Sequence, residues 1–170
     1  ENCLYSPDVI SFAREKGYFS GLNKDFSFAN AYAPLDFGAR RYCEARVWSF
    51  YNMFTDRGEE FLPYILGSTD KPMPLYVKAK KRISVQEIQQ AMRDHYEGTP
   101  LDLSQDFGAG INHSPYRLSP LSFTVDGEEY FNERPISTQQ TGWVIVAQMR
   151  EQLPNAIGGV LWFGCDDANM

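Results

Sequence analysis

The sequence predicts an α+β fold, with helices in the first half of the chain and antiparallel strands in the second half. Apolar residues recur every three or four positions in the first half, as they do on the buried face of helices. Further along, Asp126-Gly127 is a tight-turn dipeptide between two short strand-like runs. Two longer apolar runs, 136–149 and 157–165, then follow, joined by 152–155. Helices followed by strands favour helices layered on a sheet.

Three helices are expected. The first covers residues 6–17 and has a start signal and a stop signal at its two ends. The second and longest runs from Pro34 to about Asp56, on the spacing of its apolar residues. The third begins at Ser84, where Ser84 and Glu87 match the capping-box pattern, and it stops before Gly98.

The strands are expected in two pairs. The runs 121–125 and 129–131 flank the turn dipeptide and predict a hairpin. The runs 136–149 and 157–165 are the main strands. Residues 142–147 are nearly all apolar, which predicts burial on both faces of the sheet. The stretch 99–120 lacks periodicity, and ordered loops of this length are often functional.

Charge argues against a nucleic-acid partner. The 170 residues carry a net charge of −6, and the basic run 78–82 is short. Phosphate binding needs clustered Lys and Arg. No apolar run approaches the ~18 residues of a membrane span, so we expect a soluble protein with no membrane partner. The compartment stays open, because a signal peptide of the parent protein would lie upstream of Glu1.

Cysteines and histidines do not form a self-contained catalytic or metal-binding set. Cys3, Cys43 and Cys165 are odd in number and far apart. We expect Cys43 and Cys165 to be small buried residues. His95 fits a favourable charge at the end of the third helix, whereas for His113, in the long loop, a role as base or ligand stays open.

Asp166-Asp167 closes the last strand. Two adjacent carboxylates without further ligands are a weak metal signal. We expect a solvated strand end, and no metal site is predicted in the chain.

A polar row precedes the main strands: Ser137, Thr138, Gln139, Gln140 and Thr141. Hydroxyl and amide side chains beside buried strands often line a polar pocket. The alternative, that these side chains serve ladder hydrogen bonding and turns inside the sheet, stays open.

Several longer segments carry a family resemblance: LYSPDVISFAREKGYF (4–19), FSFANAYAPLDFGARRYCEARVWSFYN (26–52), MRDHYEGTPLDL (92–103), SPYRLSPL (114–121) and the stretch 133–164. Together they cover most of the chain, which resembles the cysteine dipeptidases of the N-terminal-nucleophile hydrolase superfamily. The resemblance implies a four-layered αββα sandwich. The whole chain, 1–170, is then a single segment of a larger peptidase domain.

The resemblance also implies a mechanism. A mature N-terminal cysteine attacks the scissile carbonyl of a dipeptide, and its own α-amino group acts as base. No cofactor is implied. Because this chain opens with Glu1, we expect the nucleophile upstream and no catalytic residue within the chain. Cys3 does not suit the role, since a helix start follows it where the family's nucleophile opens a strand. The remainder of the same polypeptide is therefore an expected partner.

Supporting site residues are inferred from the same resemblance. Asn112 is the candidate oxyanion donor. Family members commonly show a Gly-Asn-Pro-Tyr-Arg type of sequence here, whereas this chain reads His-Ser-Pro-Tyr-Arg at 113–117. This departure weakens the assignment of Asn112. Arg134 and the polar row are the candidate substrate-binding residues, because an Arg pairs well with a substrate carboxylate. For Arg117 we expect only a structural role, as an anchor of the long loop 99–120.

Two other functions are considered. The parent enzyme is either a dipeptidase or an amidase or acyltransferase of the same superfamily, and the pocket sequence does not separate these. The 12 Phe and 10 Tyr residues also fit a non-catalytic binding module with an aromatic cleft. A segment of a layered fold exposes surfaces that the rest of the protein covers, so we expect the isolated chain to self-associate as a homo-oligomer.

Overall fold

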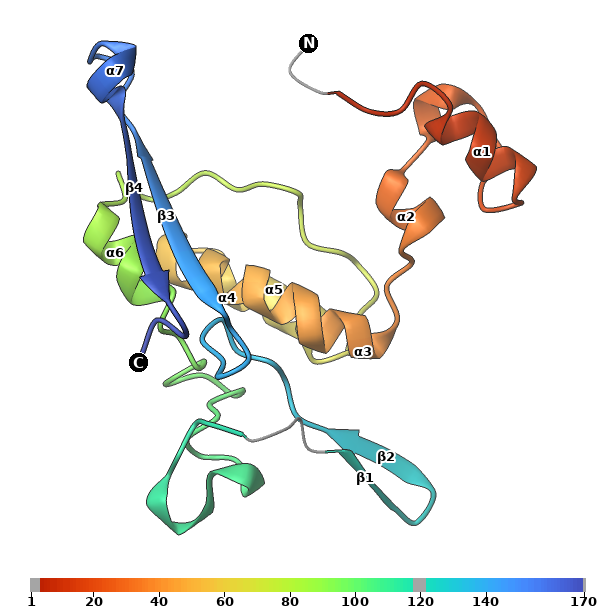
Figure 1. Ribbon diagram of the computed structural model, residues 1–170. Helices are drawn as coiled ribbons and strands as arrows, with labels where there is room; N and C mark the ends of the chain where they lie inside the picture. The colour runs from red at the N-terminus through yellow and green to blue at the C-terminus, as the bar shows by residue number, and fades with distance from the viewer. Residues whose placement is uncertain (1–3, 118–121, 170) are drawn as a thin grey trace. The chain divides into compact units, whose positions relative to one another are not determined.

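The computed structural model describes residues 4–117 and 122–169, so Cys3 and Leu121 lie outside the described residues. The chain divides into two compact units, 1–38 and 39–170, and each is described by itself. Figure 1 shows the helices and strands along the chain.

The first unit holds α1 (Val9–Glu15), the short 3-10 helix η1 (Asn23–Asp25) and α2 (Phe28–Tyr32). The first expected helix is thus present, but it begins at Val9, because Ser6 directs its hydroxyl to the Asp8 carboxylate and does not cap the helix. It stops two residues before Gly17, as the stop signal predicts, and the φ of Gly17, +73°, is a conformation that glycine adopts without strain.

The boundary between the units falls inside α3 (Phe37–Ala39). A π-helical turn, η2 (Arg40–Glu44), and α4 (Ala45–Phe54) follow. The backbone stays in the right-handed helical region at both ends of η2, so the long helix expected over 34–56 is present from Phe37 to Phe54 with one wide turn.

The next helix, α5 (Gly58–Ile65), is not predicted by the sequence, which places a helix end at Gly58. Instead Gly58 is the first residue of α5, at a point where the chain passes close to α4. A Cβ at position 58 would lie 2.7 Å from the Cα of Asn52, so only glycine fits.

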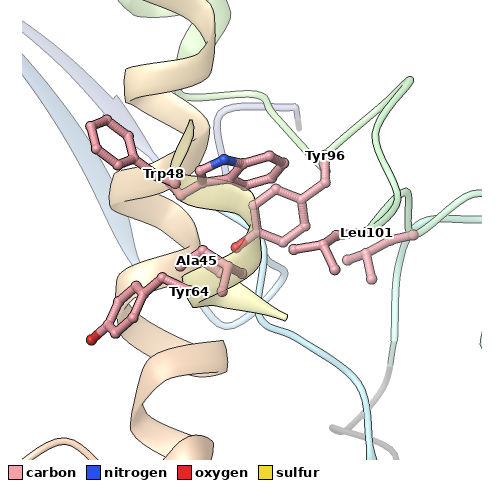
Figure 2. Packing of buried hydrophobic residues seen from close by; sticks show 8 residues of the cluster. Ala45, Trp48, Tyr64, Tyr96 and Leu101 are labelled. Atoms are coloured by element: carbon pink, nitrogen blue, oxygen red, sulfur yellow. The ribbon is translucent and has the colours of Figure 1, made fainter. Parts of the chain in front are cut away.

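The hydrophobic core of the second unit lies around α4 and α5. Its buried side chains include Trp48 and Tyr64, and Tyr96 and Leu101 from the segment after α6 pack against them (Figure 2). The indole Nε1 of Trp48 donates to the Gly58 carbonyl at 2.9 Å. This hydrogen bond satisfies a buried donor and fixes α5 against α4.

The third expected helix, α6 (Val85–Ala91), has the predicted capping box. The backbone N–H of Ser84 donates to Glu87 Oε2 at 2.8 Å, and the N–H of Glu87 donates to Ser84 Oγ at 3.2 Å. The helix is shorter than predicted and ends seven residues before Gly98. The long segment after it is irregular, as expected, apart from the 3-10 helix η3 (Phe107–Asn112).

The first expected hairpin is confirmed. Strands β1 (Ser122–Val125) and β2 (Glu128–Phe131) pair antiparallel. Asp126 and Gly127 both have positive φ, 52° and 85°, as a two-residue hairpin turn with both central residues left-handed requires.

The main strands are β3 (Trp143–Met149) and β4 (Gly159–Cys165), which pair antiparallel, with the short helix α7 (Asn155–Gly158) in their connection. The prediction that the first of these strands begins at 136 is wrong. The backbone N–H of Ser137 is bonded to the carbonyl of Asp94, and that of Thr141 to Thr138 within a turn, so this segment does not join the ladder.

Burial of 142–147 on both faces is also wrong. The inner face of the β3–β4 hairpin lies against α6 (Figure 1). The other face, here called the outer face, is exposed and consists of Trp143, Ile145, Ala147, Met149, Gly159, Leu161, Phe163 and Cys165. Both Cys43 and Cys165 are exposed, contrary to expectation.

The fold class is therefore confirmed as α+β, with helices first and antiparallel strands second. The described residues contain two separate two-stranded sheets, and the four-layered sandwich stays a prediction. No helix in the described part of the chain is long and apolar enough to cross a bilayer.

Candidate functional site

Ser137, the first residue of the polar row, is the centre of a buried hydrogen-bond network. Its hydroxyl donates to Asp167 Oδ1, and it accepts from the side-chain amide of Asn169 at 3.1 Å. Its backbone N–H donates to the Asp94 carbonyl at 3.1 Å. Ser137 is 1% exposed, so its side chain is enclosed in this network and holds the polar row in place, and its role in substrate binding stays a prediction.

Asp167 is buried, at 2% exposure, so the expectation of a solvated strand end is wrong for this residue. The chain turns at Asp166, whose φ is 66°, and this turn carries the Asp167 side chain inward to Ser137. Asp166 remains exposed and accepts a hydrogen bond from the Asp167 backbone N–H at 2.9 Å.

Three other members of the polar row, Thr138, Gln139 and Gln140, lie at a very small cavity, which Thr141 does not line. Arg134, Thr138, Gln139 and Gln140 line it together with Arg117, and its volume is about 20 Å³. A space of this size holds about one water molecule, so it is no dipeptide pocket within this chain alone. It does bring four of the predicted substrate-binding residues to one place.

The guanidinium of Arg134 lies 5.3 Å from the centre of the Tyr42 ring, and the residue is exposed. Its backbone carbonyl accepts from the Tyr96 hydroxyl at 2.6 Å, which anchors the backbone at 134 to the core. The side chain is thus supported on one side by an aromatic ring, and its exposure makes it accessible to an anion.

His95 is not an exposed charge at a helix end, as the sequence suggests, because α6 ends at Ala91. His95 is buried, and its Nδ1 lies 3.0 Å from Glu97 Oε1. The edge of its ring packs against Tyr116 with the centroids 5.2 Å apart. Within residues 4–117 and 122–169, Nε2 of His95 has no hydrogen-bond partner.

Burial changes the protonation of the carboxyl next to this histidine. Desolvation raises the pKa of Asp94 to about 6, although a hydrogen bond from the Ser49 hydroxyl, at 2.7 Å, opposes the shift. Burial also raises the pKa of the Tyr116 hydroxyl, with a further contribution from the charge of Asp167. Asp94 is partly buried and Tyr116 is exposed, and both lie beside the buried side chains of His95 and Asp167.

Asn112, the candidate oxyanion donor, is exposed at the end of η3 and does not line the cavity of the polar row. The next residue, His113, has a φ of 52°, and its Nδ1 lies 3.1 Å from the Ser104 carbonyl. The oxyanion role of Asn112 stays a prediction. Arg117 anchors this loop through the Leu103 carbonyl, at 2.8 Å, and the Asp106 carboxylate.

Comparison with known families decides the relationship of the chain. The model of peptidase family C69 matches residues 1–170, the whole sequence. The chain belongs to peptidase family C69.

Among curated relatives, this C69 chain is 28% identical over 159 residues to a probable dipeptidase of Salmonella dublin, covering 94% of the chain and 31% of that protein. It is 21% identical over 153 residues to a probable dipeptidase B of Lactococcus lactis subsp. lactis (strain IL1403), covering 89% of the chain and 27% of that protein. The chain thus spans about a third or less of the length of these relatives. No solved structure matches it.

The buried hydrogen-bond network of this C69 chain was not visible in its sequence. Asp94 and Asp167 come from two segments about seventy positions apart, and Ser137 links them by hydrogen bonds to the Asp94 carbonyl and to the Asp167 carboxylate. The Asp166-Asp167 pair is the signal in the sequence that points to this network, although the pair by itself predicts a solvated strand end. Among the described residues, no group of three His, Cys, Asp or Glu side chains is placed to hold a metal ion.

Proposed function

We propose that the protein to which this chain belongs is a cysteine-type dipeptidase. The observation that carries the proposal is the match of the C69 peptidase model to the entire chain. The names of the two relatives, both probable dipeptidases, support it. The nucleophile is a cysteine at the mature N-terminus, upstream of Glu1, and its α-amino group is the base.

In this proposal the chain supplies scaffold and part of a pocket wall. Ser137 is fixed in the buried network, and residues 138–141 continue from it toward β3. Arg134 is exposed beside Thr138, Gln139 and Gln140, and it pairs with the carboxylate of a dipeptide. The missing walls come from the remainder of the polypeptide, since the local cavity holds only about one water molecule.

The test uses the full-length protein and a panel of dipeptides. Arg134→Gln is expected to raise KM for dipeptides about 10- to 100-fold, because a charge-assisted hydrogen bond is lost. Lys78→Gln is the matched control, since Lys78 is exposed and its loss changes the net charge equally. If the two substitutions change KM equally, Arg134 does not bind the substrate carboxylate.

The same panel separates the amidase or acyltransferase alternative. Full-length protein that cleaves acyl-amides and leaves dipeptides intact is not a dipeptidase. Labelling of a mature N-terminal cysteine by iodoacetamide, with loss of activity, is expected for either enzyme. A protein with no such cysteine and no hydrolysis would be a binding module. Residues 1–170 alone are expected to show no hydrolysis.

A further inference from the structure

A polar cleft lies between the segment that enters α6 and the end of the β3–β4 hairpin that adjoins α7 (Figure 1). Its volume is about 660 Å³, within the range for small-molecule sites. Residues 82–86 form one wall, and residues 146–150 of the hairpin form the other. Among the described residues, it shares no lining residue with the cavity of the polar row. We name it the basic cleft, because its charged residues are arginines.

The two arginines of the basic cleft lie on opposite walls. Arg82 belongs to the α6 side and Arg150 to the hairpin side, and no carboxylate lines the cleft in the described part of the chain. Of the neighbouring acids, Glu87 is paired with Lys81 at 2.5 Å, and Glu151 is exposed outside the cleft. The cleft is therefore positive in a chain of net charge −6, and a cleft of one sign concentrates ligands of the opposite charge.

The donors of these arginines are accessible to a ligand. Arg150 donates through Nη2 to the Ile157 carbonyl at 2.6 Å and through Nε to the Gly158 carbonyl at 3.4 Å. Both carbonyls are neutral, so the guanidinium is held in place and keeps its positive charge. Its Nη1 makes no hydrogen bond with a described residue and is not buried. Arg82 is exposed and forms no ion pair within residues 4–117 and 122–169.

The hairpin wall changes from apolar to charged along its length. Alternate residues of a strand lie on one face, so Val146, Gln148 and Arg150 follow one another on the inner face. The ladder reaches Arg150, whose backbone N–H donates to the Gly158 carbonyl at 2.8 Å. Val146 is buried, and Trp162 lines the cleft beside it. The side-chain amide of Gln148 is accessible and has no hydrogen bond to a described residue.

We propose that the basic cleft binds a small carboxylate that carries an apolar group. Arg82 and Arg150 pair with the carboxylate, whose two oxygens match the fork of a guanidinium. The apolar group lies against Val146 and Trp162, and burial of its surface favours such a ligand over an inorganic anion. The proposal does not rest on the proposed function, because Arg134 and the polar row are not part of this cleft.

The test measures binding of isocaproate to the full-length protein by calorimetry. Isocaproamide is the neutral comparison, which keeps the alkyl group, and inorganic phosphate is the comparison that keeps the negative charge. The wild-type protein is expected to bind isocaproate at least about tenfold more tightly than either, because only isocaproate uses both the arginines and the apolar wall. Equal affinity for isocaproamide, or tighter binding of phosphate, overturns the proposal.

Arg150→Gln is expected to weaken isocaproate binding about 10- to 100-fold, because the charge that it removes is partly buried. Arg82→Gln is expected to weaken it about three- to tenfold, because water screens an exposed charge. Lys78→Gln removes the same charge from an exposed residue outside the cleft and is expected to change affinity by no more than about twofold. A loss in Lys78→Gln as large as that in Arg82→Gln overturns the assignment.

Melting temperatures separate a loss of binding from a loss of structure. Arg150 also bonds the carbonyls next to α7, so Arg150→Gln affects stability as well. Arg82 makes no such bond, and Arg82→Gln is expected to bind isocaproate more weakly at an unchanged melting temperature. Unchanged affinity in Arg82→Gln overturns the proposal whatever Arg150→Gln does.

Arg134→Gln distinguishes the basic cleft from the site proposed for dipeptides. If Arg134→Gln weakens isocaproate binding and Arg82→Gln does not, isocaproate occupies the cavity of the polar row and the proposal is overturned. Binding that depends on Arg82, in a full-length protein that cleaves no dipeptide, keeps the basic cleft and removes the dipeptidase function. Dipeptide cleavage without any isocaproate binding keeps the enzyme and removes the basic cleft.

Discussion

The hydroxyl of Ser137 donates a hydrogen bond to the buried carboxylate of Asp167, across thirty positions of the sequence. This bond joins the polar row, which precedes β3, to the turn that follows β4. Both side chains are almost completely buried. The position of the polar row is therefore set by a charged hydrogen bond in the interior of the second unit.

Removal of this donor is expected to destabilise the chain strongly. Ser137→Ala leaves the buried carboxylate without the Ser137 hydrogen bond and is expected to lower the free energy of unfolding by about 2–4 kcal/mol. Urea unfolding measures the change. Thr138→Val is the control, because the neighbouring hydroxyl makes only a long contact of 3.5 Å with Gln139. If Ser137→Ala lowers the free energy of unfolding no more than Thr138→Val does, the hydrogen bond of Ser137 does not stabilise the chain as stated.

The carboxyl of Asp94 is expected to make stability depend on pH. Its pKa is raised to about 6 in the folded chain from the ordinary value of 3.8, so the folded state holds the proton more tightly than the unfolded state. The free energy of unfolding therefore falls as pH rises from about 4 to about 6, and it levels off above this window.

Asp94→Asn tests this dependence. The variant is expected to flatten the profile between pH of about 4 and 6 and to gain about 1–2 kcal/mol at neutral pH, after allowance for the partial exposure of the group. Urea titrations at several pH values measure both effects. A profile parallel to that of the wild type would assign the pH dependence to another titratable group.

Gly58 is expected to tolerate no side chain. Gly58→Ala places a Cβ 2.7 Å from the Cα of Asn52, and separating α4 from α5 would cost about 2–3 kcal/mol of stability. Gly142→Ala is the control, because a Cβ there meets nothing within 4 Å. Thermal unfolding compares the two variants, and equal melting temperatures would disprove the close approach of the helices.

The exposed outer face of the β3–β4 hairpin is expected to cause self-association of the isolated chain. Trp143 and Phe163 are 60% and 62% exposed on this face, and a contiguous apolar surface of this kind usually has a partner. Trp143→Lys with Phe163→Lys is expected to weaken association at least about tenfold, as measured by sedimentation velocity.

The matched control for this experiment is Glu129→Lys, on the exposed side of the β1–β2 hairpin. We propose that the remainder of the polypeptide covers the outer face in the full-length protein. A wild-type chain that stays monomeric at high concentration would argue against self-association through the outer face.

Local signals in the sequence predict the structure correctly where short-range chemistry decides it. The Ser84 and Glu87 capping box and the Asp126-Gly127 turn were predicted because each depends on hydrogen bonds or dihedral angles within four residues. The α+β order and the family relationship were also evident from sequence, since both depend on patterns spread over the whole chain.

The tertiary structure alone decided the features that depend on contacts between distant segments. Position 58 must be glycine because Asn52 of α4 lies against it, and Ser137 leaves the strand ladder because its N–H is bonded to the Asp94 carbonyl. Asp167 is buried because the turn at Asp166 directs it to Ser137. Local propensity cannot specify these outcomes, because the free energy that fixes them comes from partners distant along the chain.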